Sequence, residues 1–167
     1  ERLVKSLRQF RIEAIAISLL HSYANPEHEK RLYSMLQSVV PHIALSHRVN
    51  PEAREFERAS TTVLSAGVMP LVANYIDQIE AKRPPSSRLH FFHSADGLCS
   101  PEVVRELPLA LALSGPAAGV AAASRVARDL GIDRALTFDM GGTTTDVCLI
   151  VNGDAEVSAD RSLAGRP

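Results

Sequence analysis

The segment that decides the fold is Thr137-Phe138-Asp139-Met140-Gly141-Gly142-Thr143-Thr144-Thr145-Asp146-Val147-Cys148-Leu149-Ile150, near the C-terminal end of the chain. Two short runs rich in apolar and β-branched residues, 136–140 and 147–151, flank a connector of two glycines and three threonines. Strands have this composition, and short glycine-containing connectors join neighbouring strands. The segment therefore predicts a strand, a tight turn and a second strand.

The connector has the chemistry of a phosphate-binding loop. Gly141 and Gly142 let the backbone take positive φ and bring its N–H groups close to a ligand, because no Cβ stands in the way. Thr143, Thr144 and Thr145 add three hydroxyl donors for anionic oxygens. We interpret the connector as a loop that holds phosphate.

Two aspartates, Asp139 and Asp146, bracket this loop. Carboxylates beside an anion-binding loop are expected where a cation is bound too, so this pair predicts Mg²⁺, held directly or through water. The alternative is a β-hairpin whose glycines only make the turn and whose aspartates cap strand ends. The full D-x-G-G-T-x-T-D pattern between two hydrophobic strands favours nucleotide phosphate binding.

The same residues carry a family resemblance. The loop resembles the second phosphate motif of the actin, hexokinase, sugar-kinase and chaperone ATPase superfamily, and FDMGGTTTD is most similar to the hydantoinase/oxoprolinase family. LLHSYANPEHE at 19–29, STTV at 60–63 and LSGPAAGV at 113–120 are similar to the same family. The resemblance covers nearly all 167 residues. It implies an α/β fold with ribonuclease H-like, actin-like ATPase lobes, each a mixed sheet with flanking helices.

The resemblance also implies a division of the chain. Residues 1–113 would be the C-terminal part of the N-terminal lobe, 114–131 the interlobe connecting helix, and 132–167 the start of the second lobe. The chain begins at Glu1 without an initiator methionine, so we expect a fragment of a longer two-lobe protein. The first phosphate loop and the adenosine pocket of the superfamily are not in this chain. We therefore expect no catalysis from this piece alone.

The amino-acid composition narrows the class of protein to which this chain can belong. The hydrophobic fraction of 46% and the charged fraction of 22% are typical of a soluble globular protein. The formal charge of −1 comes from interspersed acidic and basic residues, so no bulk field attracts nucleic acid or an anionic membrane. The apolar run at 12–20 is too short to span a bilayer, and no transmembrane helix is expected. Cys99 and Cys148 show no metal-site or disulfide spacing, which favours a cytoplasmic protein.

Hydrophobic periodicity predicts the other elements. We expect strands at 12–20, 42–47 and 88–93, with the first covered on both faces because it is almost continuously apolar. Pro70 should divide or kink a long helix near Gly67–Met69, since proline removes a backbone donor. Asn152-Gly153 should form a type I′ turn. The expected helices are 1–11, about 26–39, 52–81, 100–107 and one that starts at 114–116 and ends at Gly131.

Several polar positions invite a functional interpretation. His21 follows a strand at the edge where α/β sheets place ligands, but a structural hydrogen bond is favoured over metal binding. The hydroxyls of Ser60, Thr61 and Thr62 either face a cleft or bond to backbone carbonyls of their helix. We expect a solvated charged cluster at Arg54, Glu55, Glu57 and Arg58, and a buried apolar role for Cys148. Ser114 and Gly115, at a helix N-terminus, are weaker candidates for an anion contact. A site role for Asp96 is left open.

What the chain does follows by resemblance. Members of the family use ATP to activate an amide or ketone carbonyl, opening 5-oxoproline or hydantoin rings, or carboxylating ketones. The resemblance implies that Asp139 orients Mg²⁺ or the attacking group, and that Gly141, Gly142 and Thr143, with Thr144, contact ATP phosphates. Thr145 and Asp146 would secure the loop or the cation shell. A hydantoinase B-type subunit or domain is the implied partner.

Two other classes of function stay open. One is an actin-like or chaperone-like nucleotide switch that alters no small substrate. The other is an interaction module that keeps the hairpin and binds no nucleotide. The sequence does not decide between ring opening and carboxylation.

Overall fold

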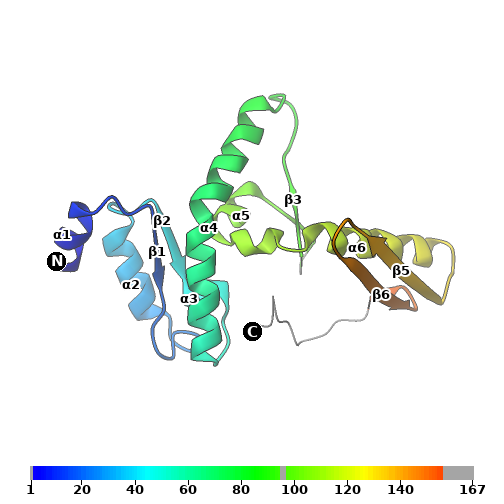
Figure 1. Ribbon diagram of the computed structural model, residues 1–167, viewed down its shortest axis with the longest axis horizontal. Coiled ribbons are helices and arrows are strands. Elements are labelled where there is room, and N and C mark those ends of the chain that lie inside the picture. The colour runs from blue at the N-terminus through cyan, green and yellow to red at the C-terminus, as the bar shows by residue number, and fades with distance from the viewer. Residues whose placement is uncertain (1, 95–96, 156–167) are drawn as a thin grey trace. The chain divides into compact units, whose positions relative to one another are not determined.

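The computed structural model describes residues 2–94 and 97–155, which fold as two compact units (Figure 1). Residues 1–90 and 100–109 make the first unit, and residues 91–99 and 110–167 make the second. Asp96 and the segment after Ala155 lie outside the described residues, so the open question on Asp96 is not addressed. The division into 1–113, 114–131 and 132–167 refers to lobes of a longer protein and stays a prediction.

A pair of parallel strands forms the centre of the first unit. Strands β1 and β2 pair from Ala14 opposite His42 to Ile17 opposite Leu45. The elements of this unit are α1 (Arg2–Gln9), β1 (Ala14–Ile17), α2 (Glu27–Leu36), β2 (His42–Leu45), α3 (Ser46–Val49), α4 (Glu55–Lys82) and α5 (Pro101–Glu106), followed by the 3₁₀ turn η1 (Pro108–Leu111). The expected strand at 12–20 is thus only four residues long, because the chain turns away from its partner after Ile17.

The two faces of this strand pair carry side chains of different size. Large residues such as Ile17 and Ile43 point to one face and pack with Leu36 of α2. Alanines such as Ala44 point to the other face, where they pack against Ala66 and Met69 of α4. Successive residues of a strand alternate between faces, and alanine allows a helix to approach closely. The expectation that the first strand is covered on both faces is confirmed.

Helix α4 is one continuous element of 28 residues with Pro70 inside it, not two helices. By length and composition alone it is long and apolar enough to cross a membrane. It packs on β1 and β2, and it holds the fully buried Arg58. These contacts bury only part of the helix, since 33% of its most apolar stretch is buried. The expected lack of a membrane segment stays a prediction.

The second unit contains two antiparallel sheets and one helix. Its elements are β3 (Phe91–His93), β4 (Gly97–Cys99), α6 (Ser114–Asp129), β5 (Arg134–Met140), β6 (Thr145–Val151) and β7 (Asp154–Ala155). Helix α6 packs against β3, β5, β6 and β7. Asn152 and Gly153 both have positive φ, which confirms the type I′ turn, and Gly131 ends α6 with a φ of +66° as expected.

The described residues therefore form a mixed α/β fold with three small sheets: parallel β1–β2, antiparallel β3–β4 and antiparallel β5–β6–β7. The expected mixed sheet is present only as these separate pieces. Strand β4 was not predicted, because three residues are too few to show an alternating pattern.

Candidate functional site

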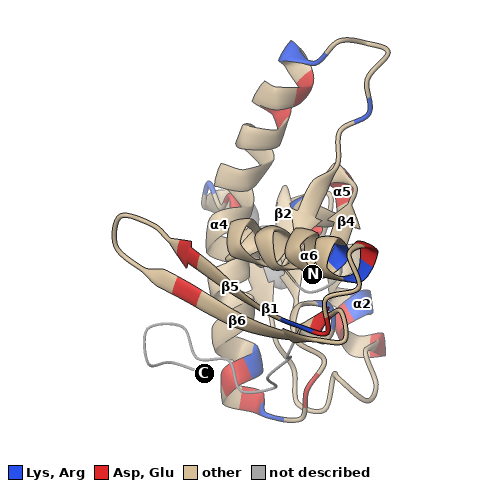
Figure 2. Ribbon diagram, turned by 90° about the vertical axis from the view of Figure 1, so that its right-hand side faces the viewer, with Lys and Arg blue, Asp and Glu red and all other residues tan. Residues whose placement is uncertain are grey.

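The β5–β6 hairpin has the register that its sequence requires. Asp139 pairs with Asp146, and Met140 pairs with Thr145 one step nearer the turn. The N–H of Gly141 then donates to the carbonyl of Thr144 at 2.9 Å. Both aspartates therefore leave the same face of the hairpin, directly behind a four-residue turn. Figure 2 shows an acidic position on each strand, with the two side by side.

The conformation of the turn does not require glycine at positions 141 and 142. Gly141 and Gly142 are not among the described glycines with positive φ, so the expectation of positive φ at these positions is wrong. A β-carbon built at Gly142 meets no atom within 4 Å, and one at Gly141 only touches the Thr144 carbonyl at an ordinary 3.5 Å. The hairpin alone would accept alanine at both positions. What the missing β-carbons leave is open space in front of the backbone, as a close ligand requires.

The turn also presents donors that have no partner among the described residues. The N–H groups of Gly142 and Thr143 and the hydroxyls of Thr143, Thr144 and Thr145 make no hydrogen bond with the part of the chain that the structure describes. The four turn residues 141–144 and the adjoining Thr145 are all exposed. A row of free N–H and O–H donors next to two glycines, which carry no β-carbon, suits phosphate oxygens.

The aspartates fit the chemistry of Mg²⁺ in part. Asp139 and Asp146 are exposed, and neither forms an ion pair within residues 2–94 and 97–155. No group of three or more metal-ligating side chains lies among the described residues. Mg²⁺ is commonly held by one or two carboxylates together with water and substrate phosphates. Two carboxylates next to a turn that could hold phosphate are therefore enough protein ligands for such an ion.

A groove of about 370 Å³ lies between α6 and this hairpin. One wall comes from α6, and the other carries Thr137, Asp139, Asp146 and Cys148. Cys148 is half-buried at this groove and not fully buried as expected, and Thr137 donates to its carbonyl at 3.3 Å. The carboxylate pair thus borders a cavity as well as the turn.

The predicted anion contact at the start of α6 lies next to this groove. Pro116 lines the groove, whereas the two residues before it, Ser114 and Gly115, do not. Leu113 precedes the helix with a φ of +59°, a conformation that a bulky residue adopts only under constraint, and it provides no side-chain cap. The first N–H groups of α6 are therefore left without a cap from Leu113.

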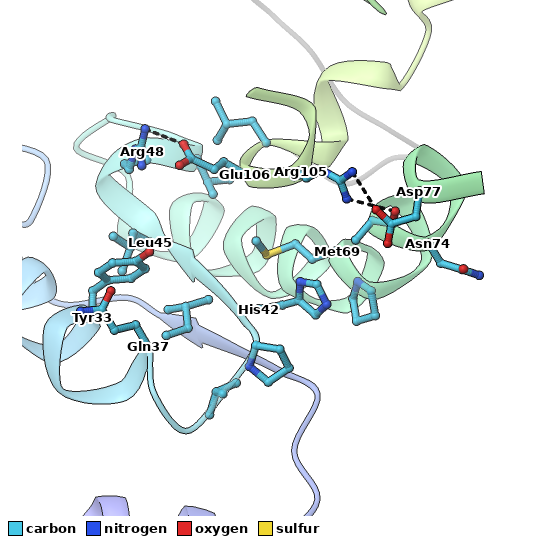
Figure 3. Close-up of a pocket in the computed structure, with 17 residues that line it drawn as sticks. Tyr33, Gln37, His42, Leu45, Arg48, Met69, Asn74, Asp77, Arg105 and Glu106 are labelled. Atoms are coloured by element: carbon cyan, nitrogen blue, oxygen red, sulfur yellow. Dashed lines mark hydrogen bonds and ion pairs between the residues drawn. The ribbon is translucent and has the colours of Figure 1, made fainter. Parts of the chain in front are cut away.

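A second cavity, of about 610 Å³, lies in the first unit between α2, β2, α4 and α5 (Figure 3). Its charged side chains are already paired. Arg48 contacts Glu106 at 2.6 Å, and Arg105 contacts Asp77 and Glu80 at 2.7 Å each. Burial alone would lower the pKa of Arg105, but the ion pairs with Asp77 and Glu80 raise it above its ordinary value. These pairs link α5 to α3 and α4, and among the described residues they leave no unpaired Lys, Arg, Asp or Glu at this cavity for a ligand.

A buried polar network stands at the carboxyl ends of β1 and β2. Glu29 is fully buried and accepts hydrogen bonds from Leu19 N–H, Ser46 Oγ, His47 N–H and His47 Nδ1, the last at 2.7 Å. Burial would raise the pKa of Glu29, but the bonds from Ser46, His47 and Leu19 together hold it below its ordinary value. The network therefore fixes the loops that follow both strands.

Arg58 belongs to this network, which corrects the expectation of a solvated charge. It is fully buried and donates to Ser46 Oγ, the Glu52 carbonyl and the Leu19 carbonyl. The sequence pattern did not reveal the burial of Arg58, because its charged neighbours Arg54 and Glu55 are indeed exposed. Its guanidinium supplies N–H donors to two loop carbonyls that are removed from water.

Thr61, Thr62 and His21 are the other polar residues that the sequence singled out in this unit. Thr61 and Thr62 donate to the carbonyls of Glu57 and Arg58, so these hydroxyls bond to the backbone of their helix. His21 has a φ of +54° and its carbonyl accepts from Ala24 and Asn25 N–H, which makes it a turn residue. These bonds involve the backbone of His21 only, so the predicted hydrogen bond of its side chain stays a prediction.

Comparison with known proteins shows the family of this chain. Residues 58–167 match the family described as hydantoinase/oxoprolinase, and residues 1–40 match the hydantoinase/oxoprolinase N-terminal region. The chain belongs to the hydantoinase/oxoprolinase family. The first match alone covers about two thirds of the chain and includes α6 and the β5–β6 hairpin.

Relatives of this family member include several ATP-dependent enzymes. Caprolactamase subunit alpha of Pseudomonas jessenii is 36% identical over 92% of this chain and 23% of that protein. The 5-oxoprolinase of Saccharomyces cerevisiae is 32% identical over 98% of this chain and 13% of its own length. The nucleotide-free structure of acetone carboxylase, from work on ATP-dependent acetone carboxylation, superposes with a TM-score of 0.72 at 28% identity, over 99% of this chain and 24% of that one. The chain thus spans about a quarter or less of each.

Proposed function

We propose that this chain carries a phosphate-binding hairpin of an ATP-dependent enzyme that opens cyclic amides. The observation that carries the proposal is the turn at 141–144 with the adjoining Thr145. Its two glycines serve no backbone need, and the N–H groups of Gly142 and Thr143 and the three threonine hydroxyls have no partner in the described residues. The relatives named above include an ATP-dependent ring-opening class, and the chain covers only a part of each. The activity therefore belongs to the complete protein.

The proposed reaction activates the carbonyl by phosphorylation. The amide oxygen attacks the γ-phosphorus of ATP, the bond from that phosphorus to the bridging oxygen breaks, and ADP leaves. One water adds to the activated carbon, the C–N bond breaks, and the nitrogen leaves with a proton from that water. A second water hydrolyses the resulting acyl phosphate to a carboxylate and inorganic phosphate. An unactivated amide is a poor electrophile, and the phosphoryl group removes that barrier.

The described residues supply position and charge for this step. N–H groups of Gly142 and Thr143, with the threonine hydroxyls, would hold phosphate oxygens in place. Asp139 and Asp146 would hold Mg²⁺ from the groove side of the turn. Mg²⁺, when bound, neutralises charge on the phosphate oxygens. Asp139 is the residue to which we assign the catalytic role.

Replacing Asp139 by asparagine tests this assignment. In the complete protein, Asp139→Asn should abolish ATP turnover and leave the circular dichroism spectrum unchanged, because the side chain is exposed and bonds to nothing described. Asp129→Asn is the matched control, since Asp129 is an exposed carboxylate that only pairs with Arg125 on α6. Turnover at the wild-type rate in Asp139→Asn would remove this residue from the mechanism.

Ketone carboxylation is the second candidate. It is favoured by the match to acetone carboxylase over nearly the whole chain. ATP hydrolysis that requires both a ketone and bicarbonate would establish it, whereas hydrolysis driven by a cyclic amide alone would establish ring opening. We further propose a hydantoinase B-type partner, because relatives such as caprolactamase subunit alpha are named as subunits. A cytoplasmic location is a separate proposal, which rests on the lack of disulfide spacing at Cys99 and Cys148.

A further inference from the structure

The two ends of the β5–β6 hairpin differ in how firmly they are held. At its base, Ile150 is fully buried and α6 packs against both strands. At its tip, residues 139–146 are all exposed, and a bond from Gly141 N–H to the Thr144 carbonyl closes the turn. Segments with few buried contacts and exposed hydrogen bonds open locally at a small fraction of the free energy of global unfolding. The tip is therefore the part of the hairpin that opens most easily.

A pair of like charges lies at this tip. Asp139 of β5 is directly opposite Asp146 of β6. The β-carbons of opposite residues lie about 4.5–5.5 Å apart, and like charges at that separation weaken the pairing of the strands. Neither carboxylate forms an ion pair with residues 2–94 or 97–155, and no described lysine, arginine or histidine lines the groove beside them. As long as no cation is bound, the two aspartates therefore favour the open tip.

The repulsion is confined to the tip. Thr137 opposite Cys148 is the next pair on the same face of the hairpin, and both side chains are uncharged. The pairing of the strands does not require carboxylates at the tip, because a β-branched residue such as threonine suits a strand better than aspartate does. The two aspartates thus weaken the free hairpin, and they stabilise it only when a cation neutralises them.

We propose, on the basis of the magnesium site in the function proposed above, that Asp139 and Asp146 are an electrostatic switch. Their repulsion keeps the tip of the metal-free hairpin loose, and a divalent cation that binds to both carboxylates closes it. In the closed tip the N–H groups of Gly142 and Thr143 are already ordered, so a phosphate group that binds them costs less conformational entropy. Because coupling between two sites is reciprocal, the cation then raises the affinity for phosphate, and phosphate raises the affinity for the cation.

Hydrogen–deuterium exchange of the complete protein, without nucleotide, tests the switch. MgCl₂, compared with NaCl at the same ionic strength, should slow exchange of the amides at 139–146 by about two- to five-fold, the range expected for a cross-strand charge pair. Exchange at the base, 148–151, should not change.

Two substitutions at the same position change the charge pair in known directions. Asp146→Asn removes the repulsion, so it should slow exchange of the tip in NaCl and abolish most of the response to MgCl₂. Asp146→Lys places an opposite charge across from Asp139, so it should slow exchange in NaCl at least as much. Asp154→Asn is the matched control, because Asp154 is an exposed aspartate of the same sheet that lies opposite Val151 and forms no like-charge pair.

The outcomes separate the switch from the proposed function. Exchange at the tip that does not respond to MgCl₂, or that stays fast in Asp146→Asn, would overturn the switch even if the complete protein hydrolyses ATP. The same slowing in Asp154→Asn as in Asp146→Asn would also overturn it, because net charge and not the pair would then control the tip. If MgCl₂ slows exchange as expected but the complete protein does not hydrolyse ATP, the proposed function fails and the switch stands.

Discussion

The side chain of Arg128 occupies the space where a β-carbon would stand at Gly153. A β-carbon built at Gly153 would lie against Cγ of Arg128 and 2.7 Å from its Cδ, closer than real β-carbons approach other atoms. Arg128 lies in the last turn of α6, and Gly153 lies in the turn between β6 and β7. The backbone adds a second link, because Asn152 N–H donates to the carbonyl of Asp133 at 2.7 Å. The turn between β6 and β7 is therefore packed against the last turn of α6 and bonded to the residue that precedes β5.

Gly153→Ala should loosen this end of the hairpin. The φ of +83° disfavours alanine and the new methyl group must displace Arg128, so we expect a loss of about 1–3 kcal/mol. In the complete protein, hydrogen–deuterium exchange of the β6 and β7 amides should become faster. Gly67→Ala is the control, because Gly67 lies inside α4 with open space around it and alanine favours a helix by about 0.5–1 kcal/mol. Unchanged exchange in Gly153→Ala would contradict the fixed geometry.

Glu29→Gln should destabilise the first unit. The carboxylate accepts four hydrogen bonds, and a glutamine amide would turn a donor toward at least one of those donors, at a cost of about 1–3 kcal/mol. Glu27→Gln serves as the control, since exposed Glu27 pairs only with exposed Lys30 and such pairs contribute little. The midpoint of urea unfolding should fall for Glu29→Gln and hold for Glu27→Gln. Equal midpoints in the two variants would show that the network does not stabilise the fold.

Acid should remove the contribution of Glu29. Hydrogen bonds hold the pKa of Glu29 below its ordinary value of 4.5, so at pH values between the two the unfolded chain binds more protons than the folded one. The stabilisation is then complete above pH 4.5 and is lost as the pH falls through the folded pKa. The difference in urea midpoint between wild type and Glu29→Gln should accordingly shrink below pH 4.5. A difference that stays constant down to pH 3 would mean that Glu29 does not titrate with a lowered pKa.

The parts of the fold that follow from local rules were predictable from the sequence. The Asn152-Gly153 turn, the glycine end of α6 and the pairing of the two strands around the 141–144 turn each depend on residues that are neighbours in the chain. Local chemistry decides such features, because a type I′ turn needs positive φ wherever it occurs. The candidate site was readable for the same reason, since its donors and carboxylates lie within eight consecutive residues.

Features that depend on distant residues were not predictable. Arg58 was assigned to a solvated face because its neighbours in sequence are charged, whereas its partners Leu19 and Ser46 come from other elements. The groove at the hairpin needs α6, which packs there through side chains too small to leave a hydrophobic pattern. Of the two outcomes predicted at Pro70, the division of α4 is wrong and the kink stays a prediction, since the tertiary packing of the helix outweighs the loss of one hydrogen bond. In each case a contact across the fold decided the outcome.

Gly142→Ala distinguishes a ligand cradle from a simple turn. The backbone at Gly142 does not have positive φ and a β-carbon there meets no atom within 4 Å, so alanine should leave the stability of the hairpin unchanged or slightly raised. If phosphate oxygens approach the Gly142 N–H closely, the added methyl group must push them away, and the Kd for ATP should rise by at least about ten-fold, or about 1.4 kcal/mol. Isothermal titration of the complete protein with ATP measures this, and Gly67→Ala provides the control for a glycine far from the turn in sequence. A Gly142→Ala protein that binds ATP as tightly as wild type would return the glycines to a structural role and leave the threonines and aspartates without their proposed ligand.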